Sequence, residues 1–276
     1  MMKSCSRRGN VQPPGPGLAE VAEIPFESYG QSVALAMDAA GAANVLAGHG
    51  SFLLKPNLVN SSPPPVTTPP QLCRAVIDYI HARIPHARII IAEGCGDPHM
   101  ETGAVFGMLG YRELAEQTGA ELLDLNQAPV VERKTPDHEV FPTMHLPEAA
   151  FSHCLISLPV LKRHSYAGIT GTLKNMMGFA PPDHYSGRGG YWKKSVFHLQ
   201  MHESLRDLNR HILPDFTIMD ATVGMVEYHL GGRVEPYGLL LASADAYALD
   251  CRAAELLHIA PETIGHLHRT REYMGS

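Results

Sequence analysis

Strand-like apolar runs that alternate with helical segments constrain the fold of this chain more than any other feature of its sequence. The run "ARIIIAEG" at residues 87–94 is almost continuously apolar, which is typical of a parallel strand covered on both faces. Further strands are expected at residues 18–24, 51–59, 120–125, 153–161, 215–225 and 237–243. Helices are expected at residues 32–47, 71–84, 104–119, 197–213 and 246–259. This alternation predicts an α/β fold, a three-layer sandwich with a mostly parallel central sheet.

The length of 276 residues suits one domain with a substantial core. Residues 1–18 are rich in Gly, Pro and polar residues and are expected to form a disordered tail, which leaves 19–276 as a single α/β domain. Residues 129–147 interrupt the alternation and predict an edge hairpin. The loop at 180–194 has few apolar residues to anchor it, and it is interpreted as a lid over a binding site.

Composition excludes several classes of protein. A net charge of -6 gives no support to nucleic-acid binding, and no apolar stretch is long enough to predict a membrane span. The five cysteines form no CxxC pair, so an iron–sulfur cluster is not expected, and their odd, scattered arrangement fits a reducing cytoplasm. The sequence gives no indication of an oligomeric state.

Polar side chains recur where the expected strands end. Because ligands bind outside the carboxyl ends of the strands in open α/β sheets, these side chains are expected to line one crevice. They are Lys55 and Asn57, Glu93, Lys162 and His164, Asp220, and Asp245.

The segment "LPVLKRHSYAGITGTLKNMMGF" at residues 158–179 gathers positive charge after a strand. It is interpreted as a flexible Gly-rich loop whose free N–H groups, with the start of a helix near Thr170, face an anion. Lys162 and Lys174 would neutralise a phosphate or carboxylate, and Asn175 would orient it. The spacing does not match a P-loop, and the alternative interpretation is an ordinary solvated basic loop.

The remaining candidates divide between catalysis, metal binding and structural roles. His164 is a candidate general acid/base or metal ligand, and its alternative role is to cap a turn. Glu93 and Asp220 are candidate ligands for a divalent metal ion at the same site, or carboxylates that orient a lysine. Asp245 is assigned to ligand binding, with the alternative that it only caps the helix that follows.

Several motifs together resemble the domain-of-unknown-function family 362, widespread in bacteria and archaea, from about residue 50 onward. They are "KPNLV" at 55–59, "AEG" at 92–94, "LGYRELAEQTGAELLDL" at 109–125, "LPVLKRH" at 158–164, "ITGTLKNMMG" at 169–178, "PDFTIMDATVGM" at 214–225 and "ASADAYALD" at 242–250. The resemblance implies no settled reaction. Many relatives carry a ferredoxin-like iron–sulfur segment with CxxC repeats, which this chain lacks.

The expected architecture is also distantly similar to lactate racemase and its nickel-pincer relatives. Those proteins use a lysine and histidines to hold a nucleotide-derived nickel cofactor for hydride chemistry, and no residue role is carried over from them to this chain.

Taken together, these features predict an enzyme that binds an anionic small molecule or a phosphate-bearing cofactor in a polar crevice. Lys162, His164 and Lys174 are the candidate catalytic residues for acid–base chemistry, with a divalent metal ion as a candidate cofactor. The alternative is a non-catalytic module that binds an anionic metabolite or cofactor.

Overall fold

One twisted sheet runs through the protein, and its strands are mostly parallel. The computed structural model describes residues 21–135, 137–187 and 191–268, so the predicted tail at 1–18 lies outside the described residues. Nine strands of this described part join the sheet, in the order β1-β11-β10-β7-β2-β3-β4, with β8 beside β10 and β9 beside β8. Their bounds are β1 (Ala22–Pro25), β2 (Ser51–Pro56), β3 (Arg88–Glu93), β4 (Glu121–Asp124), β7 (Cys154–Leu158), β8 (Val160–His164), β9 (Gly168–Ile169), β10 (Phe216–Met225) and β11 (Val234–Ser243).

The parallel part of the sheet contains the point where its strand order reverses direction. β4, β3, β2, β7 and the start of β10 pair in parallel, whereas β11 pairs antiparallel with both β10 and β1. The chain proceeds from β2 outward to β3 and β4, and from β7 in the opposite direction to β10 and β11. A ligand site in an open α/β sheet lies at such a reversal, outside the carboxyl ends of the strands. Here that place is the end of β2 and β7.

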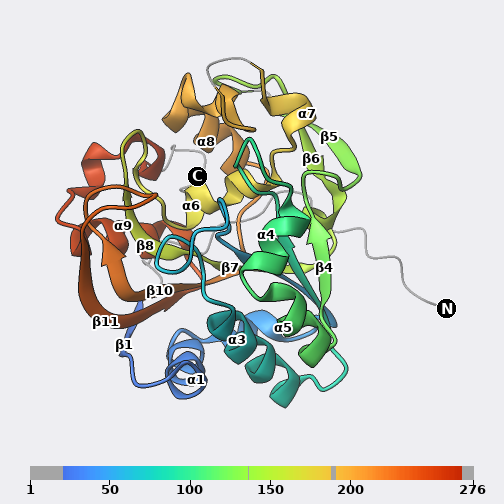
Figure 1. Cartoon of the computed structure of the whole chain (residues 1–276), viewed down its shortest axis with the longest axis vertical. Coiled ribbons are helices and arrows are strands. Elements are labelled where there is room, and N and C mark those ends of the chain that lie inside the picture. Colours follow the sequence, from blue (N-terminus) through green and yellow to red (C-terminus); the bar gives the residue numbers. More distant parts are fainter. Residues whose placement is uncertain (1–20, 136, 188–190, 269–276) are drawn as a thin grey trace.

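Helices cover both faces of the sheet, as the three-layer prediction requires (Figure 1). Phe52 and Leu54 of β2 contribute to the core on one face, while Leu53 between them contributes to the core on the other. The first face carries α1 (Tyr29–Ala39), α2 (Ala42–Leu46), α3 (Pro70–Arg83), α4 (Thr102–Met108) and α5 (Tyr111–Thr118). The opposite face carries α6 (Thr172–Asn175), α7 (Pro182–Tyr185), α8 (Met201–Asn209) and α9 (Ala246–Leu256).

Glycine ends the helices earlier than the apolar pattern predicted. Gly41 and Gly110 adopt left-handed backbone conformations, with φ of 71° and 80°, and each separates one expected helix into two. Short 3₁₀ helices supply further connections: η1 (Glu148–Phe151), η2 (Met176–Phe179), η3 (Ser195–His198), η4 (Pro261–Thr263) and η5 (Gly265–Leu267). In the described ranges, every helix is too short or too polar to span a lipid bilayer.

The predicted edge hairpin at 129–147 is present. β5 (Val130–Lys134) and β6 (Thr143–Pro147) pair antiparallel in a separate two-stranded sheet. Met144 and Leu146 of β6 pack into the core of the second face, so the hairpin extends that layer.

The basic segment after β7 is not the flexible loop that the sequence suggested. Pro159 separates β7 from β8, but β8 pairs with β10 and with β9 and remains in the sheet. Leu161 packs into the core under α9, while Lys162 and His164 lie on the other side of the strand, and both are buried. The expectation failed because Gly and basic residues were interpreted as marks of solvent exposure.

Helix α6 begins at a carboxylate that comes from another helix. Asp250 of α9 is fully buried and accepts hydrogen bonds from the backbone N–H groups of Thr172 (2.6 Å) and Leu173 (2.9 Å). These N–H groups have no partner within their own helix, so the carboxylate supplies the missing acceptors. Gly171 leaves room for it, since a Cβ there would lie 2.3 Å from Asp250 Oδ1. Asp250 thereby fixes the position of α6.

We expect Asp250→Ala to lower the free energy of unfolding by about 2–4 kcal/mol, because two buried N–H groups would lose their acceptor. Urea denaturation measures the change. Asp78→Ala is the matched control, because Asp78 pairs with Arg74 at an exposed position and should contribute less than about 1 kcal/mol. Equal losses in the two variants would contradict the capping role.

Candidate functional site

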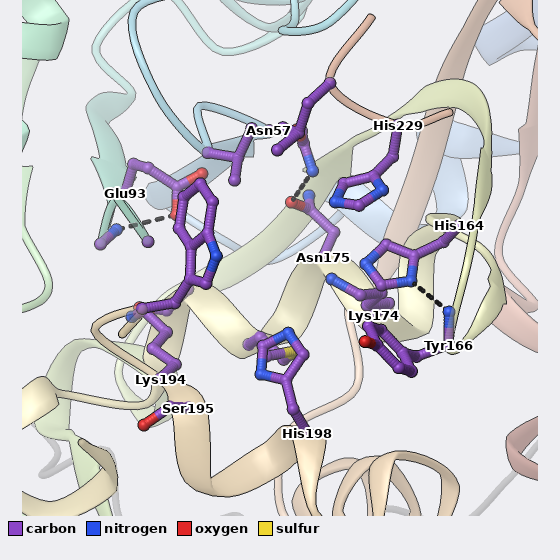
Figure 2. Close-up of a pocket in the computed structure, with 17 residues that line it drawn as sticks. Asn57, Glu93, His164, Tyr166, Lys174, Asn175, Lys194, Ser195, His198 and His229 are labelled. Carbon is purple, nitrogen blue, oxygen red and sulfur yellow. Dashed lines mark hydrogen bonds between the residues drawn. The ribbon is translucent and has the colours of Figure 1, made fainter. Parts of the chain in front are cut away.

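A cavity of about 360 Å³ lies at the carboxyl ends of β2, β3 and β8, at the predicted edge of the sheet. Figure 2 shows Glu93 and Lys194 on one side of it, and His164, Lys174 and His229 on the other. Its polar lining comes from Asn57, Glu93, His164, Lys174, Asn175, Lys194, Ser195, His198 and His229. Segments from distant parts of the chain therefore build one site.

A buried ion pair forms the floor of the site. Lys55 Nζ lies 2.6 Å from Glu93 Oε1, and both side chains are almost completely shielded from solvent. Burial lowers the pKa of Lys55 despite the attraction of Glu93. Glu93 also accepts hydrogen bonds from the backbone N–H groups of Leu58 and Gly94, each at 2.8 Å. The carboxylate thus joins the ends of β2 and β3.

Two glycines allow the chain to approach this ion pair closely. A Cβ at Gly178 would lie 2.3 Å from both Glu93 Oε1 and Lys55 Cε, and one at Gly94 would lie 2.4 Å from the carbonyl oxygen of Gly178. No side chain fits at such distances, so glycine is required at both positions.

Asn175 connects the ion pair to the rest of the site. Its Nδ2 donates to the carbonyl oxygen of Lys55 (3.0 Å) and to Ser157 Oγ (3.1 Å), and its Oδ1 accepts from Lys55 Nζ and Asn57 Nδ2 at 3.3 Å each. Asn57 Oδ1 in turn accepts from Lys162 Nζ at 3.1 Å. The amides place Lys55 and Lys162 in one continuous hydrogen-bond network that reaches α6.

Three further lysines surround the site without a carboxylate of their own. Lys162 Nζ donates to Asn57 and to the carbonyl oxygen of Val66 (2.7 Å), and Lys194 Nζ donates to Asn126 Oδ1 and two carbonyl oxygens, those of Gly178 and Ala180. Lys174, on α6, lines the cavity and is partly exposed to it. Glu93 is the one carboxylate among the described lining residues, and it forms its ion pair with Lys55.

Burial, with a smaller contribution from neighbouring lysines, lowers the pKa values of these three ammonium groups. Burial lowers the pKa of Lys162 to about 7, with repulsion from Lys174 as the next cause. Burial likewise lowers the pKa of Lys174 to about 8 and that of Lys194 to about 7, although Glu93 offsets part of each decrease. Lysines with pKa values in this range exchange protons near neutral pH.

The imidazole of His164 is held in one tautomer. Its Nδ1 accepts hydrogen bonds from the backbone N–H groups of Tyr166 and Ala167, both at 3.2 Å. An N–H group can only donate, so Nδ1 carries the lone pair and the proton of the neutral ring resides on Nε2. Burial, and then repulsion from Lys174, lowers the pKa of His164 far below its usual range. His164 is therefore a neutral hydrogen-bond donor.

Two more histidines complete this wall of the cavity. His229, from the loop between β10 and β11, stacks on His164 with ring centroids 4.0 Å apart. Burial, together with Lys174 and Lys162, lowers the pKa of His229 to about 3. His198 of η3 also has a pKa lowered by burial and by Lys174. All three rings are neutral at physiological pH because burial disfavours the charged imidazolium and the nearby Lys174 adds repulsion.

The structure brings together most of the residues that the sequence singled out. Lys55, Asn57, Glu93, Lys162, His164, Lys174 and Asn175 all lie in or directly behind the cavity. Asp245 does not: it is the N-cap of α9, where it accepts from the backbone N–H groups of Tyr247 and Ala248. This position matches the alternative interpretation of Asp245.

The metal-ligand set predicted from sequence is not assembled. Asp220 accepts hydrogen bonds from Tyr29 Oη (2.6 Å) and from Thr222, and it lines a different cavity from Glu93. His164 directs its lone pair at the backbone rather than at the cavity. Across the described ranges, no three His, Cys, Asp or Glu side chains gather in a way that could hold a metal ion.

Other residues that line the cavity were not predicted from the sequence to belong to the site. His198 lies in a segment interpreted as an ordinary helix, and His229 lies in a loop without periodicity, so no local pattern distinguished them from the other histidines. Lys194 and Trp192 belong to the predicted lid at 180–194. Both side chains line the cavity, and Lys194 is almost completely buried; residues 188–190 lie outside the described residues. The lid itself remains a prediction.

Comparison with known proteins identifies the family. The family described as "Domain of unknown function (DUF362)" matches residues 52–255. The chain belongs to this DUF362 family. The thylakoid-associated protein sll1697 of Synechocystis sp. (strain PCC 6803) is 30% identical over 244 residues, which cover 79% of this chain and 68% of that protein.

A solved structure shares the fold of this DUF362 protein. The lactate racemase apoprotein from Thermoanaerobacterium thermosaccharolyticum matches with a TM-score of 0.54 at 10% sequence identity, over 84% of this chain. The chain spans 55% of the length of that protein. At this identity the similarity establishes the α/β architecture, and the chemistry of the site has to be argued from its own residues.

We expect Gly178→Ala to lower the free energy of unfolding by about 1–3 kcal/mol, because the added methyl group forces Lys55 and Glu93 apart. Urea denaturation measures the loss. Gly30→Ala is the matched control, since a Cβ at Gly30 of α1 meets no atom within 4 Å and should be neutral or stabilising. Unchanged stability of Gly178→Ala would mean that Lys55 and Glu93 can shift to accommodate the methyl group.

The lowered lysine pKa values predict how stability depends on pH. Unfolded lysine has a pKa of about 10.4, so between about pH 7 and 8.5 the unfolded chain binds more protons than the folded protein, and stability should rise with pH. The window ends at about pH 8.5 because burial raises the pKa of Cys73 to about 12. Above the pKa of an unfolded thiol, the folded protein keeps a proton on Cys73 that the unfolded chain loses, so this group lowers stability as the pH rises.

Urea denaturation across this pH window tests the expectation. Lys162→Met should make the rise smaller, because only Lys174 and Lys194 still contribute, whereas Lys134→Met, which removes an exposed lysine, should leave it unchanged. A flat profile in the unmodified protein would show that the lysines keep their protons in the folded state.

Proposed function

We propose that this protein is an enzyme that binds a small organic anion, a carboxylate or a phosphate ester, in the cavity at the sheet reversal and transfers protons to or from it. The observation that carries the proposal is the imbalance of charge. The cavity and its walls hold the amines of Lys55, Lys162, Lys174 and Lys194, but Glu93 is the one carboxylate among the described lining residues and it is paired with Lys55.

An anionic ligand would correct this imbalance. Burying an unpaired ammonium group is costly, and a protein relieves that cost by lowering the pKa or by binding a counter-ion. The lowered pKa values of Lys162, Lys174 and Lys194 express the first response. When an anion binds, its charge stabilises the protonated lysines, so binding is accompanied by proton uptake.

The same groups support acid–base chemistry. With a pKa of about 8, Lys174 is the lining residue best suited to give or take a proton near neutral pH. His164 cannot act as a base through Nε2 because that nitrogen carries the proton, so its role is to donate a hydrogen bond to bound ligand. Trp192 and Tyr166 line the mouth and limit the size of the ligand.

We expect Lys174→Met to weaken anion binding by about 10- to 100-fold, the effect of losing one charge-assisted hydrogen bond. A panel of small carboxylates and phosphate esters is screened by thermal shift, and the best binder is then titrated by calorimetry in two buffers of different ionisation enthalpy. Lys134→Met, an exposed-lysine variant, should bind like the unmodified protein. Binding that is unaffected by Lys174→Met, or that releases protons, would overturn the assignment.

A further inference from the structure

Among the lysines of the site, Lys174 differs in the hydrogen bonding of its amine. An ammonium group has three N–H donors. Lys55 uses its donors on Glu93, Asn175 and the carbonyl oxygen of Pro56, and Lys194 uses its donors on Asn126, Gly178 and Ala180. Lys162 has two acceptors, Asn57 and Val66. These three amines are held by the protein.

Lys174 has no such acceptor among the residues that the structure describes, yet it lines the cavity and is partly exposed to it. Its helix is fixed at the N-terminus by Asp250, and the next residue, Asn175, is fixed by Lys55 and Ser157. The side chain therefore extends from a rigid base, and its nitrogen is left available to a ligand. A nitrogen without intramolecular hydrogen bonds keeps its lone pair for reaction whenever it is deprotonated.

We propose that Lys174 forms an imine with the carbonyl carbon of a small anionic aldehyde or ketone bound in this cavity. The inference rests on the proposed anion-binding function and narrows its substrate to anions that carry a carbonyl group. The anionic end of the ligand would lie toward Lys194 and His198, while its carbonyl group would face Lys174 and His164.

The chemistry balances without an external reagent. The lone pair of the neutral amine attacks the carbonyl carbon and forms a C–N bond, and the carbonyl π electrons move to the oxygen. Both amine protons then leave with that oxygen as water, and a C=N bond remains. Burial in a cationic surrounding keeps a fraction of Lys174 neutral near physiological pH, which the attack requires. The neutral His164 can donate its Nε2–H to the carbonyl oxygen.

Reduction of the imine with borohydride tests the proposal, since it converts the C=N bond into a stable secondary amine. The protein is incubated with glyoxylate, with glycolaldehyde phosphate, or with uncharged glycolaldehyde, then reduced, and the adduct is located by peptide mass spectrometry. Calorimetry with the same compounds, without reductant, measures anion binding separately. The variants are Lys174→Arg, which keeps a cation but cannot form an imine, and Lys193→Arg, which changes a lysine outside the cavity lining.

We expect one adduct per chain, at Lys174, with at least one charged probe and much less with glycolaldehyde. Preference for glyoxylate or for the phosphate identifies the anionic group of the substrate. The adduct should be lost in Lys174→Arg and retained in Lys193→Arg. Binding by calorimetry without an adduct would overturn the imine and leave the anion-binding function standing, whereas adducts spread equally over exposed lysines would also overturn it. Absence of both binding and adduct would refute the two proposals together.

Discussion

The ion pair between Lys55 and Glu93 is the interaction on which the rest of the site depends. It joins the ends of two neighbouring strands, and its partners also hold the backbone of Leu58 and the amide of Asn175. Removing one member of a buried ion pair leaves a charge without compensation, which typically costs about 3–5 kcal/mol. The pair therefore fixes the turn after β2, the position of α6 and, through α6, the amine of Lys174. Its contribution lies in positioning the site more than in net stability.

Around this pair the protein has accumulated positive charge that its own carboxylates do not neutralise. Burial lowers the pKa values of Lys162, Lys174 and Lys194, and repulsion adds to the effect, from Lys174 on Lys162 and from Lys55 on the other two. Burial, and then the nearby lysines, likewise keep His164 and His229 neutral. Such a cavity would be poor for a cation and for an uncharged molecule, but it is suited to an anion. The same burial produces the neutral amine that the proposed nucleophilic chemistry needs. The proposed binding and the proposed reactivity would thus share one cause, the burial of amines that lack a carboxylate partner.

The periodicity of the sequence predicted the sheet, its mostly parallel strands and the edge where ligands bind, because apolar runs and strand ends are local features. Lys55, Asn57, Glu93 and Asn175 could be predicted for the same reason: each lies at or near a strand end or next to a Gly-rich turn. The sequence wrongly placed Asp220 in the same cavity as Glu93, because β8 lies between the strand of Asp220 and that cavity. Strand order is not visible in any local pattern.

His198, His229 and the burial of Lys194 depend on contacts between distant segments, which a single sequence does not encode in any window. The prediction of a flexible loop at 158–179 failed for another reason. It assumed that a lysine marks the surface, whereas here backbone and amide oxygens hold Lys162 inside the protein.

The contact between Gly94 and Gly178 has a consequence for how relatives of this protein can diverge. Any larger residue at either position collides with the backbone or with the ion pair, so the floor of the cavity has almost no freedom to change shape. Variation in ligand preference must therefore arise at the rim, from Tyr166, Trp192 and the loop that carries His229. A family built on this scaffold would keep one rigid cavity floor while its entrance adapts to many different molecules.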